Sequence, residues 1–211
     1  MKKIRIGTRG STLALTQAEQ AKRLIQENFP DCETEICVIK TVGDKDHVRS
    51  LVSFGGQGVF VKEIEEALLE GKIDLAVHSL KDVPDSMDPR LELSGFLKRE
   101  NPRDVLVSSG ISFWNLRKGS TVGTGSPRRV LQLKAMRPDI KCVNLRGNLP
   151  SRIEKVKTGE LDAVMLGAAG LVRLGLSSEI SDAFSVEQVT PAIGQGIVAL
   201  QSLRKNTFAR N

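Results

Sequence analysis

The chain has 211 residues, of which 40% are hydrophobic and 4% aromatic, and its formal net charge is +6 at pH 7. This length is enough to bury one large core or two smaller ones. No apolar run approaches the roughly 18 residues that a membrane-spanning helix needs, and no signal-peptide pattern follows the first two lysines. We therefore expect a soluble, cytoplasmic protein without a membrane partner.

The three cysteines do not form the pattern of a metal site. An odd number of cysteines cannot pair completely, and Cys32 and Cys37 lack both the spacing and the second ligand pair of a zinc site. Cys142 stands alone later in the chain. We expect free thiols in a reducing compartment and no bound metal.

The surplus of positive charge lies in one window of the chain. Residues 126–173 contain ten lysines and arginines against four acids, which accounts for the whole net charge. Nucleic acid would be one partner for such a window. However, the window contains no aromatic residue, so platforms for base stacking are missing. A small polyanionic ligand is the better interpretation, and we expect no nucleic acid partner.

Strand and helix patterns alternate from one end of the chain to the other. Strands are predicted at residues 3–8, 35–41, 73–78, 91–97, 104–108, 121–124, 140–145, 161–166 and 197–201. Helices are predicted from Ser11 to just before Pro30, over 60–70, from Ser126 onward, over 150–157 and over 168–174. Such alternation is typical of α/β folds whose mostly parallel sheets carry helices on both faces.

Two irregular stretches indicate that the chain crosses between two lobes. "KRENPRD" at 98–104 and "VTPAIGQG" at 189–196 interrupt the alternation. We expect lobe 1 to comprise residues 1–98 and 195–211, and lobe 2 residues 99–194. Two lobes of the periplasmic-binding-protein type, joined by two hinge crossings, would bind a ligand beyond the carboxyl ends of their strands.

A pair of arginines stands where a helix disfavours positive charge. Ser126 and Pro127 suit the start of a helix, and Arg128 and Arg129 then occupy its first turn. The helix dipole opposes a cation there by about 0.3 to 1 kcal/mol. A bound anion would offset this cost, although two solvated arginines would also fit. Arg152 repeats the pattern at the next helix.

Three more arginines lie at or shortly after the ends of predicted strands. Arg9 and Arg146 each precede a glycine after a strand, and Arg173 lies in "AAGLVRLG". Each alone could be an ordinary surface residue. Together with the arginines above, we expect them to converge on one cleft and to bind carboxylates through two parallel hydrogen bonds each.

The stretch "AVHSLKDVP" at 76–84 ends a buried strand in a polar cluster. Asp82 follows Lys81, and a neighbouring cation favours the ionised carboxylate, which could stabilise a developing cation or move a proton. Lys-Asp-Val-Pro-Asp is also ordinary turn chemistry. His78 could equally be a core histidine with a satisfied hydrogen bond.

Seven stretches of the chain, taken together, resemble the porphobilinogen deaminase (hydroxymethylbilane synthase) family. They lie between residues 4 and 201, follow the order of the family and read "IRIGTRGSTLALTQAE", "FVKEIEEALLEGKIDLAVHSLKDVP", "RENPRDVLVS", "GTGSPRR", "NLRGNLPSRIEKV", "LDAVMLGAAGLVRLG" and "PAIGQG". The resemblance implies a transferase of haem (tetrapyrrole, porphyrin) biosynthesis that deaminates four porphobilinogen molecules and joins them into linear hydroxymethylbilane. A dipyrromethane cofactor would prime the growing polypyrrole chain.

The resemblance also implies roles for individual residues. Asp82 would be the catalytic carboxylate. The residues implied to hold the carboxylates of substrate and cofactor, or to line the site, are Arg9, Ser11, Gln17, Lys81, Thr124, Ser126, Arg128, Arg129, Arg146, Arg152 and Arg173. The glycine-rich stretch 43–58 would be a mobile lid.

The sequence departs from the family pattern in three places. Gln57 replaces a lysine of the lid, and Gly125 replaces a serine before the paired arginines. The family's third domain, whose cysteine anchors dipyrromethane, has no counterpart here, and none of the three cysteines has a matching context. We therefore expect either an inactive two-domain fragment or a partner chain that supplies the third domain.

One competing hypothesis remains beside the enzyme. A non-catalytic, two-lobed module that binds a small polycarboxylate would explain the arginines and the architecture equally well. The variant Asp82→Asn separates the two, because it should spare binding under both hypotheses and remove turnover only under the first.

Overall fold

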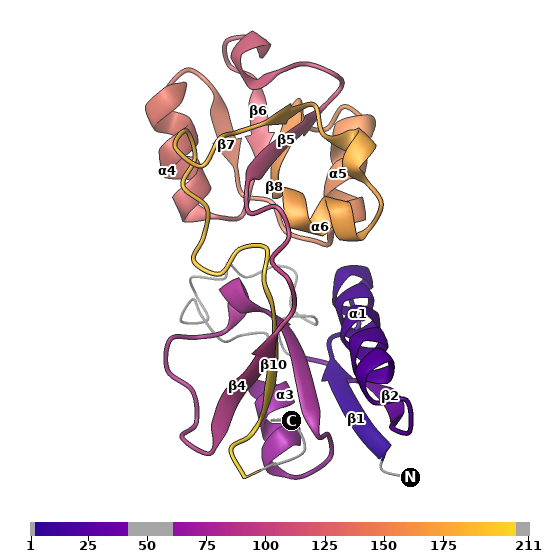
Figure 1. Ribbon diagram of the computed structural model, residues 1–211. Helices are drawn as coiled ribbons and strands as arrows, with labels where there is room; N and C mark the ends of the chain where they lie inside the picture. Colours follow the sequence, from indigo (N-terminus) through magenta and orange to yellow (C-terminus); the bar gives the residue numbers. More distant parts are fainter. Residues whose placement is uncertain (1–2, 42–60, 206–211) are drawn as a thin grey trace. The chain divides into compact units, whose positions relative to one another are not determined.

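The structure is a computed structural model that describes residues 3–41 and 61–205 (Figure 1). The chain divides into two compact units. Unit 1 comprises residues 1–99 and 197–211, and unit 2 comprises residues 100–196. The chain therefore passes from unit 1 to unit 2 once and returns once. Within the described ranges, no helix is long and apolar enough to cross a membrane.

Unit 1 is built on one five-stranded sheet with the order β2-β1-β3-β10-β4. Its elements are β1 (Lys3–Thr8), α1 (Thr12–Asn28), β2 (Glu33–Val38), α3 (Lys62–Leu69), β3 (Leu75–Ser79), the 3₁₀ helix η2 (Leu80–Asp82), β4 (Leu91–Phe96) and β10 (Val198–Leu203). β1 is parallel to both β2 and β3, whereas β10 is antiparallel to β3 and to β4. One strand of five thus runs against the others.

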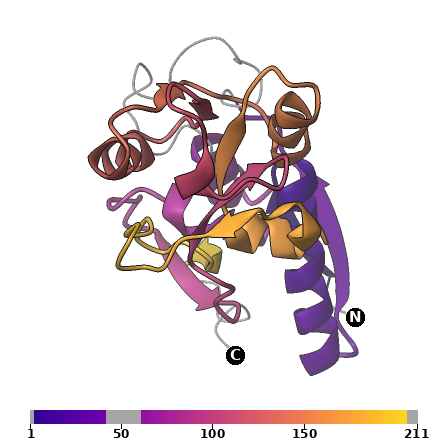
Figure 2. The ribbon, with the colours of Figure 1, turned by 90° about the horizontal axis from the view of Figure 1, so that it is seen from above.

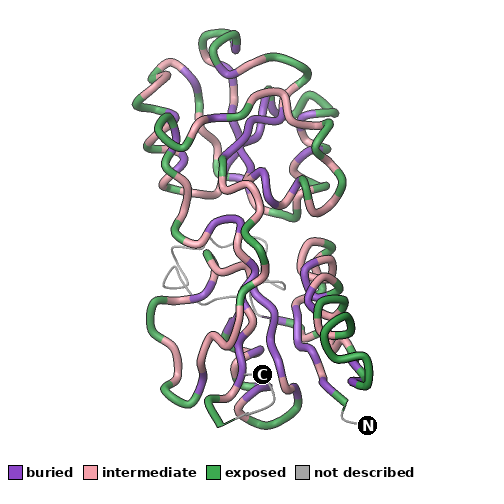
Figure 3. Tube along the Cα trace, in the orientation of Figure 1, coloured by how far each residue is buried: buried purple, intermediate pink, exposed green. Residues whose placement is uncertain are grey.

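Alternation along β3 explains why α1 and α3 pack on opposite faces of this sheet. Val77 belongs to the core that includes Ala18 and Ala21 of α1. Ala76, one position away, belongs to the core that includes Ile64 and Leu68 of α3. Successive side chains of a strand point to opposite faces, so a strand with both sets apolar must be covered twice. β3 is accordingly buried at all but its last position, as Figure 3 shows in the lower part of the view.

Unit 2 repeats this topology with the strand order β7-β6-β8-β5-β9. Its elements are β5 (Asp104–Ser108), η3 (Phe113–Asn115), β6 (Thr121–Gly123), α4 (Pro127–Met136), β7 (Lys141–Val143), α5 (Leu149–Lys157), β8 (Ala163–Gly167), α6 (Ala168–Arg173), η4 (Ser177–Glu179) and β9 (Asp182–Ala183). β6 is parallel to β7 and β8, and β5 is antiparallel to β8 and β9. Leu133 of α4 belongs to one core, and Ile153 of α5 and Leu171 of α6 belong to the other. Figures 1 and 2 show α4 on one side of the sheet and α5 with α6 on the other.

The predicted α/β class with mostly parallel sheets is confirmed, with one strand reversed in each sheet. The reversed strand lies beside a crossing: β5 follows the passage into unit 2, and β10 follows the passage back. The short strand β9 was not predicted, because its two residues carry no alternation. No repeat is evident in the sequence, yet the two units share one strand order. The predicted lid at 43–58, with Gln57, lies outside the described residues.

Candidate functional site

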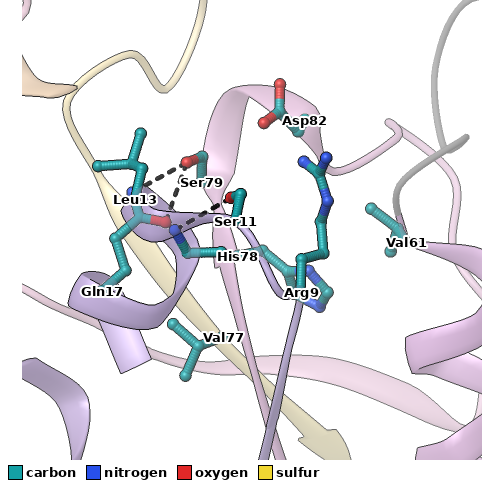
Figure 4. Close-up of a pocket in the computed structure, with 10 residues that line it drawn as sticks. Arg9, Ser11, Leu13, Gln17, Val61, Val77, His78, Ser79 and Asp82 are labelled. Carbon is teal, nitrogen blue, oxygen red and sulfur yellow. Dashed lines mark hydrogen bonds between the residues drawn. The ribbon is translucent and has the colours of Figure 1, made fainter. Parts of the chain in front are cut away.

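A pocket in unit 1 opens at the carboxyl ends of β1 and β3 (Figure 4). Its lining comes from the start of α1, from the residue before α3 and from the segment after β3: Arg9, Ser11, Leu13, Ala14, Gln17, Val61, Val77, His78, Ser79 and Asp82. The carboxyl edge of a mostly parallel sheet is where ligands of such folds bind. Four predicted site residues meet here, namely Arg9, Ser11, Gln17 and Asp82.

The start of α1 gives this pocket a positive edge. Ser11 is the N-cap, and its Oγ accepts a hydrogen bond from the Ala14 backbone N–H at 3.3 Å. The first turn of α1 contains no acidic residue, so the partial positive charge of the helix start is not neutralised by its own side chains. A carboxylate is the kind of group that such an edge stabilises.

Arg9 and Asp82 approach the pocket from neighbouring strands. Arg9 follows β1, and Asp82 ends the 3₁₀ turn that follows β3. That turn is held by the Leu80 N–H, which donates to the Ile197 carbonyl at 3.0 Å, and by the Val83 N–H, which donates to the Leu80 carbonyl at 3.1 Å. Figure 4 shows the Arg9 guanidinium extending toward the Asp82 carboxylate. A cation and an anion thus stand at one end of the pocket.

Gln17 and Ser79 form the opposite wall. The Gln17 Nε2 donates to the Ser79 Oγ at 2.9 Å, and the Ser79 Oγ lies 3.3 Å from the Gln17 Oε1. This pair joins α1 to the end of β3 and fixes both side chains. Lys81, although predicted for the site, is exposed and is not part of the lining.

His78 is the buried member of the lining, with 5% of its surface exposed. Burial lowers the pKa of its imidazole to about 4. The hydrogen bond with Gln201 has the opposite, smaller effect and raises this pKa. The ring is therefore neutral at pH 7. His78 is thus a buried histidine with a hydrogen bond, and it is also part of the pocket lining.

The paired arginines of unit 2 have a partner within the chain. Asp104, the first residue of β5, is fully buried. Its Oδ1 accepts from the Arg129 Nε at 3.0 Å and from the Arg129 Nη2 at 2.7 Å, and its Oδ2 lies 2.7 Å from the Arg128 Nη1. Burial alone would raise the pKa of the Asp104 carboxyl, but the charge of Arg129 and the hydrogen bonds from Arg128, Gln195 and Arg129 hold it below its ordinary value.

Asp104 supplies a counter-charge that the helix-dipole argument did not consider. The anion that compensates two cations in the first turn of α4 is this carboxylate. Arg129 is 6% exposed and also donates to the Met165 carbonyl at 3.1 Å, so its guanidinium is part of the interior. Arg128 is more open, and it donates to the Thr190 carbonyl in the stretch before the return crossing. Sequence reasoning missed Asp104, because it was considered only as the start of a strand.

The other predicted residues of unit 2 lie at the ends of strands and starts of helices. Thr124 is buried, and its Oγ1 accepts from the Ser126 N–H at 3.3 Å. Ser126 is the N-cap of α4 but makes no capping bond with its side chain. Arg152 donates from Nε to the Gly147 carbonyl at 2.7 Å, and Arg146 is half-buried after β7.

Arg173, at the end of α6, is tied to the return crossing. Its Nη2 donates to the Gly196 carbonyl at 2.9 Å, and burial lowers the pKa of its guanidinium. Gln195 is joined to the same region, since its Nε2 donates to the Pro102 carbonyl at 2.6 Å and to the Asp104 Oδ1 at 2.9 Å. Arg128 and Arg173 therefore both contact the return crossing, and Gln195 joins that segment to Pro102.

The described residues around the pocket include neither a candidate metal site nor a cysteine. In the parts of the chain that the structure describes, no group of three or more histidine, cysteine, aspartate or glutamate residues could hold a metal ion. Cys32, Cys37 and Cys142 are free thiols, and none of them lines the pocket. Burial raises the pKa of the Cys37 and Cys142 thiols, which disfavours the nucleophilic thiolate.

Comparison with known sequences gives one consistent result. Residues 4–211 match the family described as "Porphobilinogen deaminase, dipyromethane cofactor binding domain". Proteins named porphobilinogen deaminase are 47% identical over 203 residues in Syntrophomonas wolfei and 48% identical over 201 residues in Syntrophus aciditrophicus. These alignments cover 96% and 94% of this chain but only 66% and 65% of those proteins. The chain thus spans slightly less than two thirds of the length of these relatives.

Comparison with solved structures identifies the architecture. The methionine-binding protein MetQ matches with a TM-score of 0.58 at 15% identity, over 99% of this chain and 88% of that chain. The effector-binding domain of BenM, solved with benzoate, matches with a TM-score of 0.54 at 16% identity, over 99% of this chain and 88% of that domain. At such low identity these similarities establish the fold, which is that of the periplasmic-binding-protein type.

Proposed function

The chain belongs to the porphobilinogen deaminase family, and on that basis we propose that its unit 1 pocket binds porphobilinogen and takes part in joining porphobilinogen units into linear hydroxymethylbilane. The observation that carries the proposal is the meeting of Arg9, the Ser11-capped start of α1 and Asp82 in one pocket. Porphobilinogen is a pyrrole with two carboxylate arms and an aminomethyl group. Arg9 and the positive start of α1 suit the carboxylate arms, and the Asp82 carboxylate suits the aminomethyl group.

Asp82 is the residue for the chemical step in this proposal. Loss of ammonia from the aminomethyl group leaves positive charge on the pyrrole, and a carboxylate close to the ring stabilises that charge. A carboxylate can also hold the proton that passes to the departing amine. Its place on a turn fixed by backbone hydrogen bonds keeps it aimed at the pocket.

The pocket also suits part of the dipyrromethane cofactor. Arg9, Ser11 and Asp82 would hold its carboxylates and pyrrole N–H groups, as they would those of the substrate. When bound, the cofactor supplies the free pyrrole position to which the first substrate unit is joined. No cysteine lines the pocket, so we expect a covalent anchor to come from outside these 211 residues, from a further segment or a separate chain. We place the reaction in the cytoplasm, in keeping with the three free thiols.

Ligand binding tests this proposal directly. Porphobilinogen should raise the melting temperature of the purified chain, and Arg9→Gln should weaken its binding about 10- to 100-fold, because a charge-assisted hydrogen bond contributes about 1.5–3 kcal/mol. The matched control is Arg23→Gln, which removes the same charge from the exposed face of α1. Unchanged melting at saturating porphobilinogen would rule out the pocket as its site.

Turnover separates the enzyme from the binding module. The chain, purified from a host that lacks its own deaminase, would be incubated with porphobilinogen while hydroxymethylbilane formation is followed. With added dipyrromethane as the primer in place of a covalently anchored cofactor, we expect turnover that Asp82→Asn abolishes while binding persists. Turnover by the wild-type chain that is unaffected in Asp82→Asn would contradict the role given to this carboxylate.

A further inference from the structure

A short hydrogen-bonded chain crosses unit 1 beneath the pocket. The Gln201 Nε2 on β10 donates to the Glu65 Oε1 on α3 at 2.7 Å. The Gln201 Oε1 lies 3.1 Å from the His78 Nε2 on β3. Gln201 is fully buried, so this chain links three elements through the interior. The proposed function above assigns no task to any of these three residues.

The order of donors and acceptors in this chain fixes where the imidazole proton sits. A carboxylate only accepts hydrogen bonds, so Glu65 holds the amide nitrogen of Gln201 toward itself. The amide oxygen must then face His78, and His78 must donate its Nε2–H. Burial keeps the ring neutral at pH 7. A neutral imidazole with its proton on Nε2 carries an acceptor lone pair on Nδ1.

The position of His78 in the sheet shows where that lone pair points. β3 lies between β10 and β1. Nε2 is hydrogen-bonded to Gln201 of β10. The imidazole ring lies beside Arg9, which follows β1, and both residues line the pocket (Figure 4). Among the described residues, Nδ1 has no hydrogen-bond partner. It is also not one of the fully enclosed polar atoms without a partner, so it keeps some accessible surface. Because His78 belongs to the lining, Nδ1 opens toward the pocket.

We infer that His78 is a ligand-contacting residue whose Nδ1 accepts a hydrogen bond from an N–H group of the bound ring. The inference rests on the proposed function and specifies which part of the ligand His78 contacts. Arg9 and the start of α1 match the carboxylate arms, and His78 matches the pyrrole N–H or the aminomethyl group. A neutral acceptor does so without reducing the positive charge that the carboxylates need.

Nitrogen NMR tests the first half of this inference on the intact chain. The sequence contains two histidines, so ¹⁵N-histidine labelling gives two imidazoles, and a His47→Gln variant assigns them. We expect His78 to show a protonated Nε2 and an unprotonated Nδ1 between pH 6 and 8. Glu65→Ala frees the Gln201 amide to rotate and should change this tautomer ratio. A proton on Nδ1 in the wild type would overturn the inference.

Addition of porphobilinogen tests the second half. The Nδ1 resonance should shift on binding while Nε2 remains protonated. Binding without any change at Nδ1 would refute the role of His78 and leave the proposed function intact. Absence of porphobilinogen binding would refute both, while the tautomer of the free protein would still be measured.

Two substitutions separate contact from packing. His78→Gln places an amide near the Nε2 position, so it can keep the bond to Gln201 but has no acceptor at Nδ1. His78→Asn places its amide near the Nδ1 position and loses that bond. We expect His78→Gln to retain most of the melting temperature yet bind porphobilinogen about tenfold more weakly, and His78→Asn to lose more stability than affinity. Equal affinity of His78→Gln and wild type would refute the contact. If neither variant folds, the Nδ1 titration of the wild type decides.

Discussion

Asp104 illustrates at the residue scale how a buried charge depends on its partners. Its carboxylate accepts from Arg129 inside the core of unit 2 and lies beside Arg128. The variant Asp104→Asn keeps the shape but leaves Arg129 buried without a counter-charge. Removing one partner of a buried ion pair costs about 3–5 kcal/mol. We expect the free energy of unfolding, measured in urea, to fall by about that amount.

The control for this prediction is an exposed ion pair of similar chemistry. Arg90 and Asp88 form a bidentate pair on the surface of unit 1. Asp88→Asn should change the free energy of unfolding little, since solvent screens such pairs. Equal losses in Asp104→Asn and Asp88→Asn would mean that Arg129 finds another compensating group.

His78 makes stability depend on pH at the same scale. The folded imidazole has a pKa of about 4, below its ordinary value of 6.5. The unfolded chain therefore binds more protons between these values, so the stabilisation is complete above pH 6.5 and is lost as the pH falls toward 4. Between pH 7 and 4.5 the loss amounts to about 2–3 kcal/mol. His78→Gln should remove this part of the slope in urea unfolding curves, and an unchanged slope would contradict the assignment.

At the element scale, Gly125 allows the segment before α4 to pass close to the backbone that follows β7. A Cβ placed on Gly125 would lie 2.8 Å from the Leu145 carbonyl oxygen. By resemblance the family has a serine here, so this chain brings two backbone segments closer than a side chain allows. Gly125→Ala should cost about 1–3 kcal/mol through overpacking.

A second glycine provides the comparison for Gly125. A Cβ on Gly95 in β4 would meet the Leu200 side chain at 3.5 Å, which is ordinary van der Waals contact. We expect Gly95→Ala to be neutral or slightly stabilising in thermal unfolding, because alanine restricts the unfolded chain. A similar melting temperature for both alanine variants would show that the turn at Gly125 relaxes at no cost.

At the scale of the whole molecule, the two units differ in how the chain completes them. Unit 2 is continuous from residue 100 to 196, whereas unit 1 receives β10 after the return crossing. β10 lies between β3 and β4, so a fragment of residues 1–99 lacks an inner strand. We expect residues 100–196 to fold alone and residues 1–99 to remain unfolded in circular dichroism and NMR spectra.

A joined fragment provides the control for this prediction. Residues 1–99 connected to residues 197–211 through a glycine–serine linker should regain the sheet of unit 1. A folded 1–99 fragment would instead mean that β3 and β4 can close without β10. Failure of the joined fragment would show that unit 1 needs more than its own strands.

The local sequence pattern determined the fold class, the start of α1 and several of the candidate site residues. The alternation of strands and helices predicted the α/β class, and alternation of apolar side chains explains the double cover of β3. Ser11 was predicted as the cap of α1 and is that cap. The same kind of reasoning selected Arg9 and Asp82, and the family resemblance added Gln17; all three line one pocket. Reasoning of this kind depends on neighbours in sequence, or on the rule that strand ends share one edge of a sheet.

Only the tertiary structure decided which charges face the pocket and which are internal. Arg128 and Arg129 are adjacent in sequence, but Asp104 lies 25 residues from Arg129 and draws its guanidinium into the core. His78 and Gln201 are separated by 123 positions, and Gln201 reaches β3 only because β10 returns from unit 2. The partner of a buried polar group is set by which strands adjoin, and the strand order is a property of the folded chain that periodicity does not carry.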